Sequence, residues 1–168
     1  QPLMVRNAVI DLGAMAALLL TLQAHPAAFR SLHFWRCGLD AESLRLLRDG
    51  LTRLARSKDA AISSLAVEGD AADPSVGAGG LASLVELEKI GSVSLRSCSL
   101  GLVDTAPIGR ALAGASTITS LSLWSNGLDD EAAAPIIGSL RHNTALRHLN
   151  LGANRLTDTT ARAILAAL

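Results

Sequence analysis

Thiol and imidazole side chains are the first candidates for chemistry in this chain, because they can bind metal ions or act as nucleophiles. The chain has two cysteines, Cys37 and Cys98, and four histidines, which are His25, His33, His142 and His148. The histidines are scattered, and no spacing typical of a zinc site links them to the cysteines. Two cysteines cannot build a disulfide framework either. We therefore expect no metal site and no catalytic thiol.

Two further stretches could hold charge or phosphate. Asp129, Asp130 and Glu131 form an acidic run, but they open a predicted helix, where negative charge is favourable without a catalytic role. The stretch DPSVGAGG, residues 73–80, is rich in glycine, yet a phosphate-binding P-loop needs Gly-Lys-Ser/Thr at the start of a helix. We interpret it as an irregular connection on the helical side of the fold. With no nucleophile–base pair in view, we expect a protein that is not an enzyme and uses no cofactor.

Composition excludes two classes of partner. The formal net charge is zero at pH 7, which leaves no basic excess for phosphate backbones, so no nucleic acid is expected. The longest apolar run, residues 14–22, is about nine residues long and too short to cross a bilayer, so no membrane partner is expected. The chain is 49% hydrophobic but only 2% aromatic, which favours a core of small aliphatic units packed regularly.

An internal repeat organises the chain. Residues 118–128 follow the pattern L-x-x-L-x-L-x-x-N-x-L and recur 28 residues later as 146–156. Earlier copies begin at Phe29, Ile62 and Ile90, with Cys37, Asp70 and Cys98 at the asparagine position. The L-x-L segment is a short strand with alternating faces, and the asparagine can turn inward to bond backbone groups left open by the turn. Stacked copies close a core that a single copy cannot bury.

This pattern resembles the leucine-rich repeats of the ribonuclease-inhibitor-like subclass, over residues 29–168. The resemblance implies an α/β solenoid, a curved right-handed horseshoe with a parallel sheet on its concave side and helices on its convex side. Strands are expected to centre on residues 31–34, 64–67, 92–95, 120–123 and 148–151. Strand spacing puts the two cysteines about 10 Å apart, beyond disulfide reach.

The domain organisation follows from the same alignment. We expect one solenoid over residues 1–168, with a degenerate first repeat, 1–28, and clear repeats at 29–61, 62–89, 90–117, 118–145 and 146–168. Asn7, Val9 and Asp11 are assigned to the N-x-L-x-D positions of the first repeat. Leu168 falls at a core position with no cap after it, which favours a piece of a longer chain, or ends that a partner covers.

Three details of the helices are predicted. Five extra residues after Leu51 are expected to lengthen one helix and to leave Arg53, Arg56 and Lys58 in solvent. Asp130 and Asp158 are the expected helix caps. Pro107 and Pro135 share one repeat position, in or near the first helical turn, where a proline is tolerated.

The outward strand positions form three columns across the predicted sheet. The first two are mostly small, and they include His33, His148 and Asn150. The third holds both tryptophans of the chain with a charged pair between them, in the order Trp35, Glu68, Arg96 and Trp124. Tryptophan and arginine often anchor interfaces, so we predict that these seven residues bind a partner. In the alternative interpretation, each tryptophan only covers its neighbouring strand.

The resemblance implies little about function, since the fold hosts many activities. We expect a protein–protein interaction scaffold in a larger assembly, which binds by the concave face or the open ends. Alanine richness, typical of GC-rich genomes, favours a cytoskeletal or axonemal setting, and free cysteines favour the cytoplasm. The alternatives are a GTPase-activating protein of the leucine-rich-repeat type and an immune-sensor or bacterial-effector repeat domain.

Overall fold

The protein alternates strands with helices along the part of the chain that is described. The computed structural model describes residues 1–69, 80–114 and 117–168. Its strands are β1 (Pro2–Arg6), β2 (Ser31–Trp35), β3 (Ser64–Glu68), β4 (Ser92–Arg96), β5 (Ser120–Ser122) and β6 (His148–Asn150). Its helices are α1 (Leu12–Ala24), α2 (Ala41–Ala55), the short 3-10 helix η2 (Ala82–Leu84), α3 (Leu102–Gly114), α4 (Asp130–Ser139) and α5 (Asp158–Ala167).

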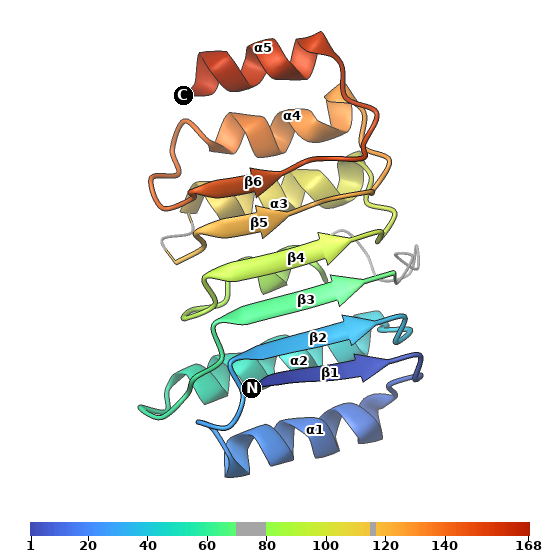
Figure 1. Cartoon of the computed structure of the whole chain (residues 1–168), viewed down its shortest axis with the longest axis vertical. Coiled ribbons are helices and arrows are strands. Elements are labelled where there is room, and N and C mark those ends of the chain that lie inside the picture. Colours follow the sequence, from blue (N-terminus) through green and yellow to red (C-terminus); the bar gives the residue numbers. More distant parts are fainter. Residues whose placement is uncertain (70–79, 115–116) are drawn as a thin grey trace.

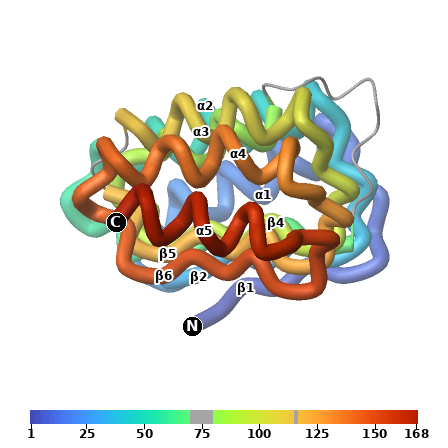
Figure 2. The backbone as a smooth tube through the Cα atoms, turned by 90° about the horizontal axis from the view of Figure 1, so that it is seen from above, coloured from blue at the N-terminus to red at the C-terminus, as the bar shows by residue number. Residues whose placement is uncertain are grey.

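The six strands form one parallel sheet in which each strand pairs with the next along the chain (Figure 1). Ser64 pairs with Ser92, Ser92 with Ser120, and Ser120 with His148, which is the 28-residue offset found in the sequence. The predicted strands and their parallel pairing are therefore confirmed. The helices lie on one side of the sheet (Figure 2). We call the opposite side the outer face.

Strand alternation separates the core from the outer face. In β2, β3 and β4 every second residue is buried, and the residues between are partly exposed. The predicted core residues Leu121, Leu123 and Ile136 are at most 1% exposed, so this prediction is confirmed. The branched aliphatic composition fits such a core, because small side chains let successive strand–helix units pack closely.

An asparagine ladder joins the last strands. The Asn126 amide donates to the carbonyls of Leu95 and Leu123, at 2.8 and 2.9 Å. Its Oδ1 accepts from the Cys98 backbone N–H at 2.8 Å. Asn154 repeats the arrangement one strand later, and its Oδ1 accepts from the Asn126 N–H at 2.9 Å. These bonds satisfy backbone groups that the turns would otherwise leave buried and unpaired.

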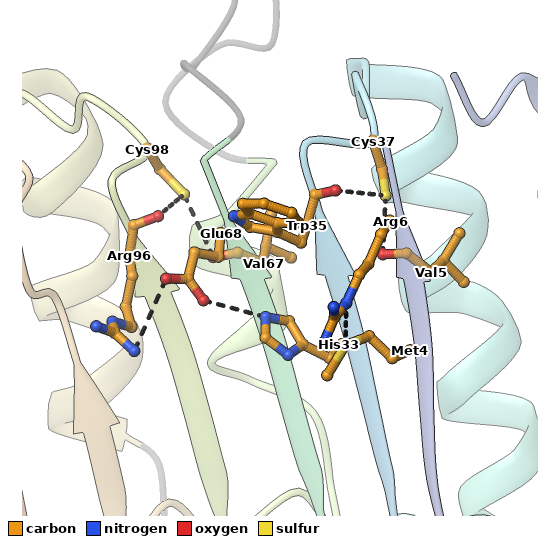
Figure 3. Close-up of polar contacts among 10 residues, drawn as sticks. All are labelled: Met4, Val5, Arg6, His33, Trp35, Cys37, Val67, Glu68, Arg96 and Cys98. Carbon is orange, nitrogen blue, oxygen red and sulfur yellow. Dashed lines mark hydrogen bonds and ion pairs between the residues drawn. The ribbon is translucent and has the colours of Figure 1, made fainter. Parts of the chain in front are cut away.

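The two cysteines occupy the same ladder position. Both thiols are fully buried and directed at backbone carbonyls (Figure 3). The Cys37 sulfur lies 3.4 Å from the Val5 carbonyl oxygen, and the Cys98 sulfur lies 3.5 Å from that of Val67. They take the donor role of the asparagine amide in a weaker form. The two thiols therefore have a structural role, because they are buried and directed at backbone carbonyls.

The first repeat departs from its predicted register by one residue. The β1–β2 pairing puts Ala8, not Asn7, at the position of Cys37. Ile10 is buried and Val9 is 87% exposed, so Val9 was wrongly assigned to the core. Asn7 instead adopts a left-handed backbone, with φ of 49°, in the turn after β1. Asparagine tolerates that conformation, which is why it occurs there without belonging to the ladder.

Two predicted helix caps are also wrong by one residue. Asp129, not Asp130, caps α4, and its carboxylate accepts from the Ala132 N–H at 2.9 Å. Thr157, not Asp158, caps α5. Both capping residues have extended backbones, as a cap requires. The Asp130 side chain instead contacts the start of α5, where its Oδ1 accepts from the Thr157 N–H at 2.9 Å.

The helix prolines lie close to their predicted place, whereas the chain end needs correction. Pro107 and Pro135 are in the second turn of α3 and α4, next to the first turn. Leu168 was predicted at a core position, but it is 90% exposed immediately after α5. The lengthened helix is confirmed: α2 has 15 residues, against 10 in α4, and the predicted Arg53, Arg56 and Lys58 are exposed. Asp70 and the stretch 73–79 lie outside the described residues.

Candidate interaction surface

The predicted columns of outward side chains lie on the outer face, and β1 extends them by one strand. β1 pairs with β2 so that Met4 lies beside His33, and Arg6 beside Trp35. Neither residue was predicted, because Asn7 drew the first repeat into the wrong register. The alternation of Leu3 and Val5, which pair with Leu32 and Phe34, is the signal that could have found them.

A chain of polar contacts crosses three strands of this face. The Glu68 carboxylate lies between two cationic or titratable groups, with His33 Nε2 at 3.1 Å from Oε2 and an Arg96 terminal nitrogen at 3.8 Å from Oε1 (Figure 3). The predicted pairing of Glu68 with Arg96 on adjacent strands is confirmed. Glu68 is 22% exposed and Arg96 is 39% exposed, so solvent screens the pair and its stabilisation is at most about 1 kcal/mol.

Arg96 connects this chain to Trp124. The guanidinium carbon of Arg96 lies 4.8 Å from the centroid of the Trp124 ring, within cation–π range. The indole also crosses the next repeat, since a Cβ added at Gly152 would lie 3.1 Å from its Cδ1 atom. Trp124 is therefore only partly exposed. The ring covers its neighbouring strand and still offers an edge to solvent.

Trp35 has two arginines over its ring. The guanidinium carbon of Arg36 lies 5.2 Å from the ring centroid, and that of Arg6 lies 5.9 Å away. The side chains of both arginines are exposed, and neither forms an ion pair with a carboxylate in the described chain. Trp35 therefore anchors two cations whose charge no carboxylate among the described residues neutralises.

A left-handed turn directs Arg36 across Trp35. The residue after the third column has positive φ at all six equivalent positions, which are Asn7, Arg36, Gly69, Ser97, Ser125 and Ala153. Each of the first five donates its N–H to the third-column carbonyl of the next strand, as Arg36 does to Glu68 at 2.9 Å. The conformation belongs to the repeating turn, and five of its six residues are not glycine. What is particular to Arg36 is the long cationic side chain placed there.

These side chains border a hollow on the outer face. It has a volume of about 290 Å³ and is lined by Met4, Arg6, His33, Trp35 and Glu68. The lining combines an indole, a thioether, two titratable groups and a guanidinium, which suits a polar ligand with an apolar part. Three of these residues were predicted as partner-binding, and two come from β1.

The seven predicted residues do not form one group. His33, Glu68, Arg96 and Trp124 are linked by the contacts above, and Trp35 lines the same hollow as the first two. His148 and Asn150 lie on β6 and take no part in these contacts; the Asn150 side chain instead accepts from the Gly152 N–H at 2.9 Å, beside the Trp124 ring. Arg36 and Arg6 join the surface in their place. We call Arg6, His33, Trp35, Arg36, Glu68, Arg96 and Trp124 the arginine–tryptophan surface.

Comparison with known families and curated proteins adds no identification. No protein-family description matches the chain, and no curated protein matches it. Within residues 1–69, 80–114 and 117–168, no three histidine, cysteine or acidic side chains are grouped so that they could hold a metal ion. No helix in those same parts of the chain is long and apolar enough to cross a membrane.

Proposed function

We propose that this chain is a leucine-rich-repeat solenoid of the ribonuclease-inhibitor-like subclass, a right-handed horseshoe with the outer face of its sheet on the concave side. Support comes from the strand register, which follows the 28-residue sequence period across β3 to β6. The ladder position recurs with the same period from Cys98 through Asn126 to Asn154. Stacked units of this kind present one broad continuous surface, which favours recognition of a macromolecule.

We further propose that the protein is a protein–protein interaction scaffold of the cytoplasm that works within a larger, cytoskeletal or axonemal, assembly. The single observation that carries the interaction is the arginine–tryptophan surface. Both tryptophans and three arginines gather there, while serine is the commonest residue at the remaining outward positions. Large amphipathic anchors beside small residues are typical of a binding surface. Their place on the sheet rather than on a loop edge favours a scaffold over a GTPase activator.

The test is affinity purification of the tagged chain from its source cells. We expect wild type to retain a defined partner and the Trp35→Ala/Trp124→Ala variant to lose it. The Arg53→Ala variant, altered on the exposed side of α2, is the control and should retain the partner. Equal recovery by all three proteins would move the interaction away from the outer face.

A further inference from the structure

The arginine–tryptophan surface has an excess of positive charge in a chain that is neutral as a whole. Among the outward positions of the six strands and their continuations, Glu68 is the one carboxylate in the described chain. Its two oxygens already face His33 and Arg96. Arg6 and Arg36 stand over Trp35 without an anionic partner among the described residues. The local excess is therefore concentrated on these two guanidiniums.

An indole beneath a guanidinium makes that guanidinium a better binding group for a carboxylate. The ring fixes the position of the cation and shields one side from water, which lowers the entropy lost when an anion binds. Arginine presents a planar set of N–H donors that matches the two oxygens of a carboxylate. Two such cations over one ring, beside a hollow of about 290 Å³, form a site for acidic side chains attached to something with an apolar part.

The dimensions favour an extended segment that crosses the strands. From β1 to β5 the sheet spans four strand steps, about 19 Å at 4.8 Å each, which about six extended residues would cover. That path runs along the third column, over Trp35, Glu68 and Arg96, and the serines and the alanine of the two neighbouring columns lie beside it, so a backbone can approach closely. Trp124 would receive the far end of such a segment.

We infer, on the basis of the proposed function, that the arginine–tryptophan surface binds an acidic, extended peptide segment of the partner protein, with carboxylates at Arg6 and Arg36. A nucleic acid or an anionic membrane offers the same charge. However, membrane recognition uses clusters of about four to eight basic residues, and phosphate backbones need a long row of cations. Three arginines against one glutamate suit the smaller charge of a peptide.

The left-handed turn supplies a sharp variant. Arg36→Gly removes the guanidinium at a position where φ is 52° and glycine is the favoured residue, so the fold should be as stable as wild type or more stable. Ser97→Gly is the matched control, because Ser97 occupies the same turn position with φ of 53° and carries no charge. Loss of binding in Arg36→Gly alone therefore cannot be attributed to unfolding.

The experiment selects short random peptides on the immobilised protein by display and measures synthetic copies of the selected peptides by titration. We expect selected peptides enriched in aspartate and glutamate. Replacing their carboxylates with amides should weaken binding about tenfold or more, and Arg36→Gly and Arg6→Gln should do the same. Ser97→Gly should bind like wild type. Raising the salt from about 0.05 M to about 0.5 M should also weaken binding.

Several results would overturn the inference. They are a selection without acidic enrichment, a selection that yields no peptide, unchanged affinity in Arg36→Gly, or tighter binding to phosphatidylserine vesicles or to an oligonucleotide than to the acidic peptides. Selection of non-acidic peptides whose binding still requires Trp124 would contradict the acidic-segment inference and leave the proposed function intact. Peptides that require neither Trp124 nor Arg36 would count against both.

Discussion

The guanidinium of Arg96 lies over the indole of Trp124, 4.8 Å from the ring centroid, and the two residues come from neighbouring repeats. The contact has two consequences. It covers part of a large apolar ring that would otherwise be exposed on the outer face, and it holds a cation in place beside Glu68. Trp35 repeats the arrangement with Arg6 and Arg36 at the other end of the surface. Tryptophan and arginine are thus paired at both ends of the arginine–tryptophan surface.

Truncation of a core leucine should test which residues of the strands face the core. Leu123 is fully buried between the sheet and the helices, so Leu123→Ala should lower the free energy of unfolding by about 2–5 kcal/mol. Leu165→Ala, at a leucine that is 76% exposed, is the control and should cost less than about 0.5 kcal/mol. Urea denaturation of the three proteins measures both values. A loss under about 1 kcal/mol at Leu123 would show that the faces are misassigned.

A glycine between two helices should tolerate no side chain. A Cβ added at Gly109 in α3 would lie 2.5 Å from the backbone carbonyl oxygen of Pro135 in α4, and a backbone atom cannot easily move away. Gly109→Ala should therefore destabilise the protein by about 1–3 kcal/mol. Gly138→Ala, near the end of α4 and with open space around it, should instead add up to about 1 kcal/mol. Equal effects in thermal unfolding would contradict this packing of α3 against α4.

The stability of the C-terminal repeats should decrease at acid pH. Hydrogen bonds from the Thr157 hydroxyl and N–H, and then from the Thr160 hydroxyl, lower the pKa of Asp130 from 3.8 to about 2. Because the folded-state pKa lies below the unfolded value, the ionised carboxylate stabilises the fold above pH 3.8. That contribution is lost as the pH falls from 3.8 through about 2.

The Asp130→Asn variant isolates this effect. Its deficit in unfolding free energy relative to wild type should be largest near neutral pH and should shrink as the pH falls from 3.8 toward about 2. Thr160→Val, which removes one hydroxyl donor to Asp130, should reduce the same deficit in a double-mutant cycle. A deficit that stays constant over the acid range would show that the Asp130 hydrogen bonds do not depend on its charge.

The repeating parts of the fold could be predicted from sequence, and the parts that depend on turns could not. Leucine alternation determines the strands from β2 to β6, because inward-facing apolar residues alternate with outward ones, and the ladder asparagines Asn126 and Asn154 mark the turns after β5 and β6. β1 was missed because Asn7 imitates the ladder residue while it occupies the left-handed turn. The role of Arg36 was missed for a related reason: only that backbone conformation carries a residue beyond the strand back over Trp35.

The candidate surface was predicted in part. Column counting placed Trp35, Glu68, Arg96 and Trp124 together, since strand alternation and a fixed period determine which side chains share a face. Counting columns in the sequence could not predict that the arginines cover the tryptophans, because cation–π geometry depends on the rotamers of long side chains. His148 and Asn150 were predicted with them, but they lie on the last strand and take no part in the linked contacts.

The most direct test of the interaction surface is Trp124→Ala, measured both for unfolding and for affinity to the partner recovered by purification. Because the ring is partly covered by Arg96, its loss should reduce stability by only about 1 kcal/mol. Binding should weaken by about 2 kcal/mol or more, roughly thirtyfold, while the Arg53→Ala control binds like wild type. A Trp124→Ala protein that loses clearly more stability than this and binds its partner normally would contradict the account and make Trp124 a packing residue.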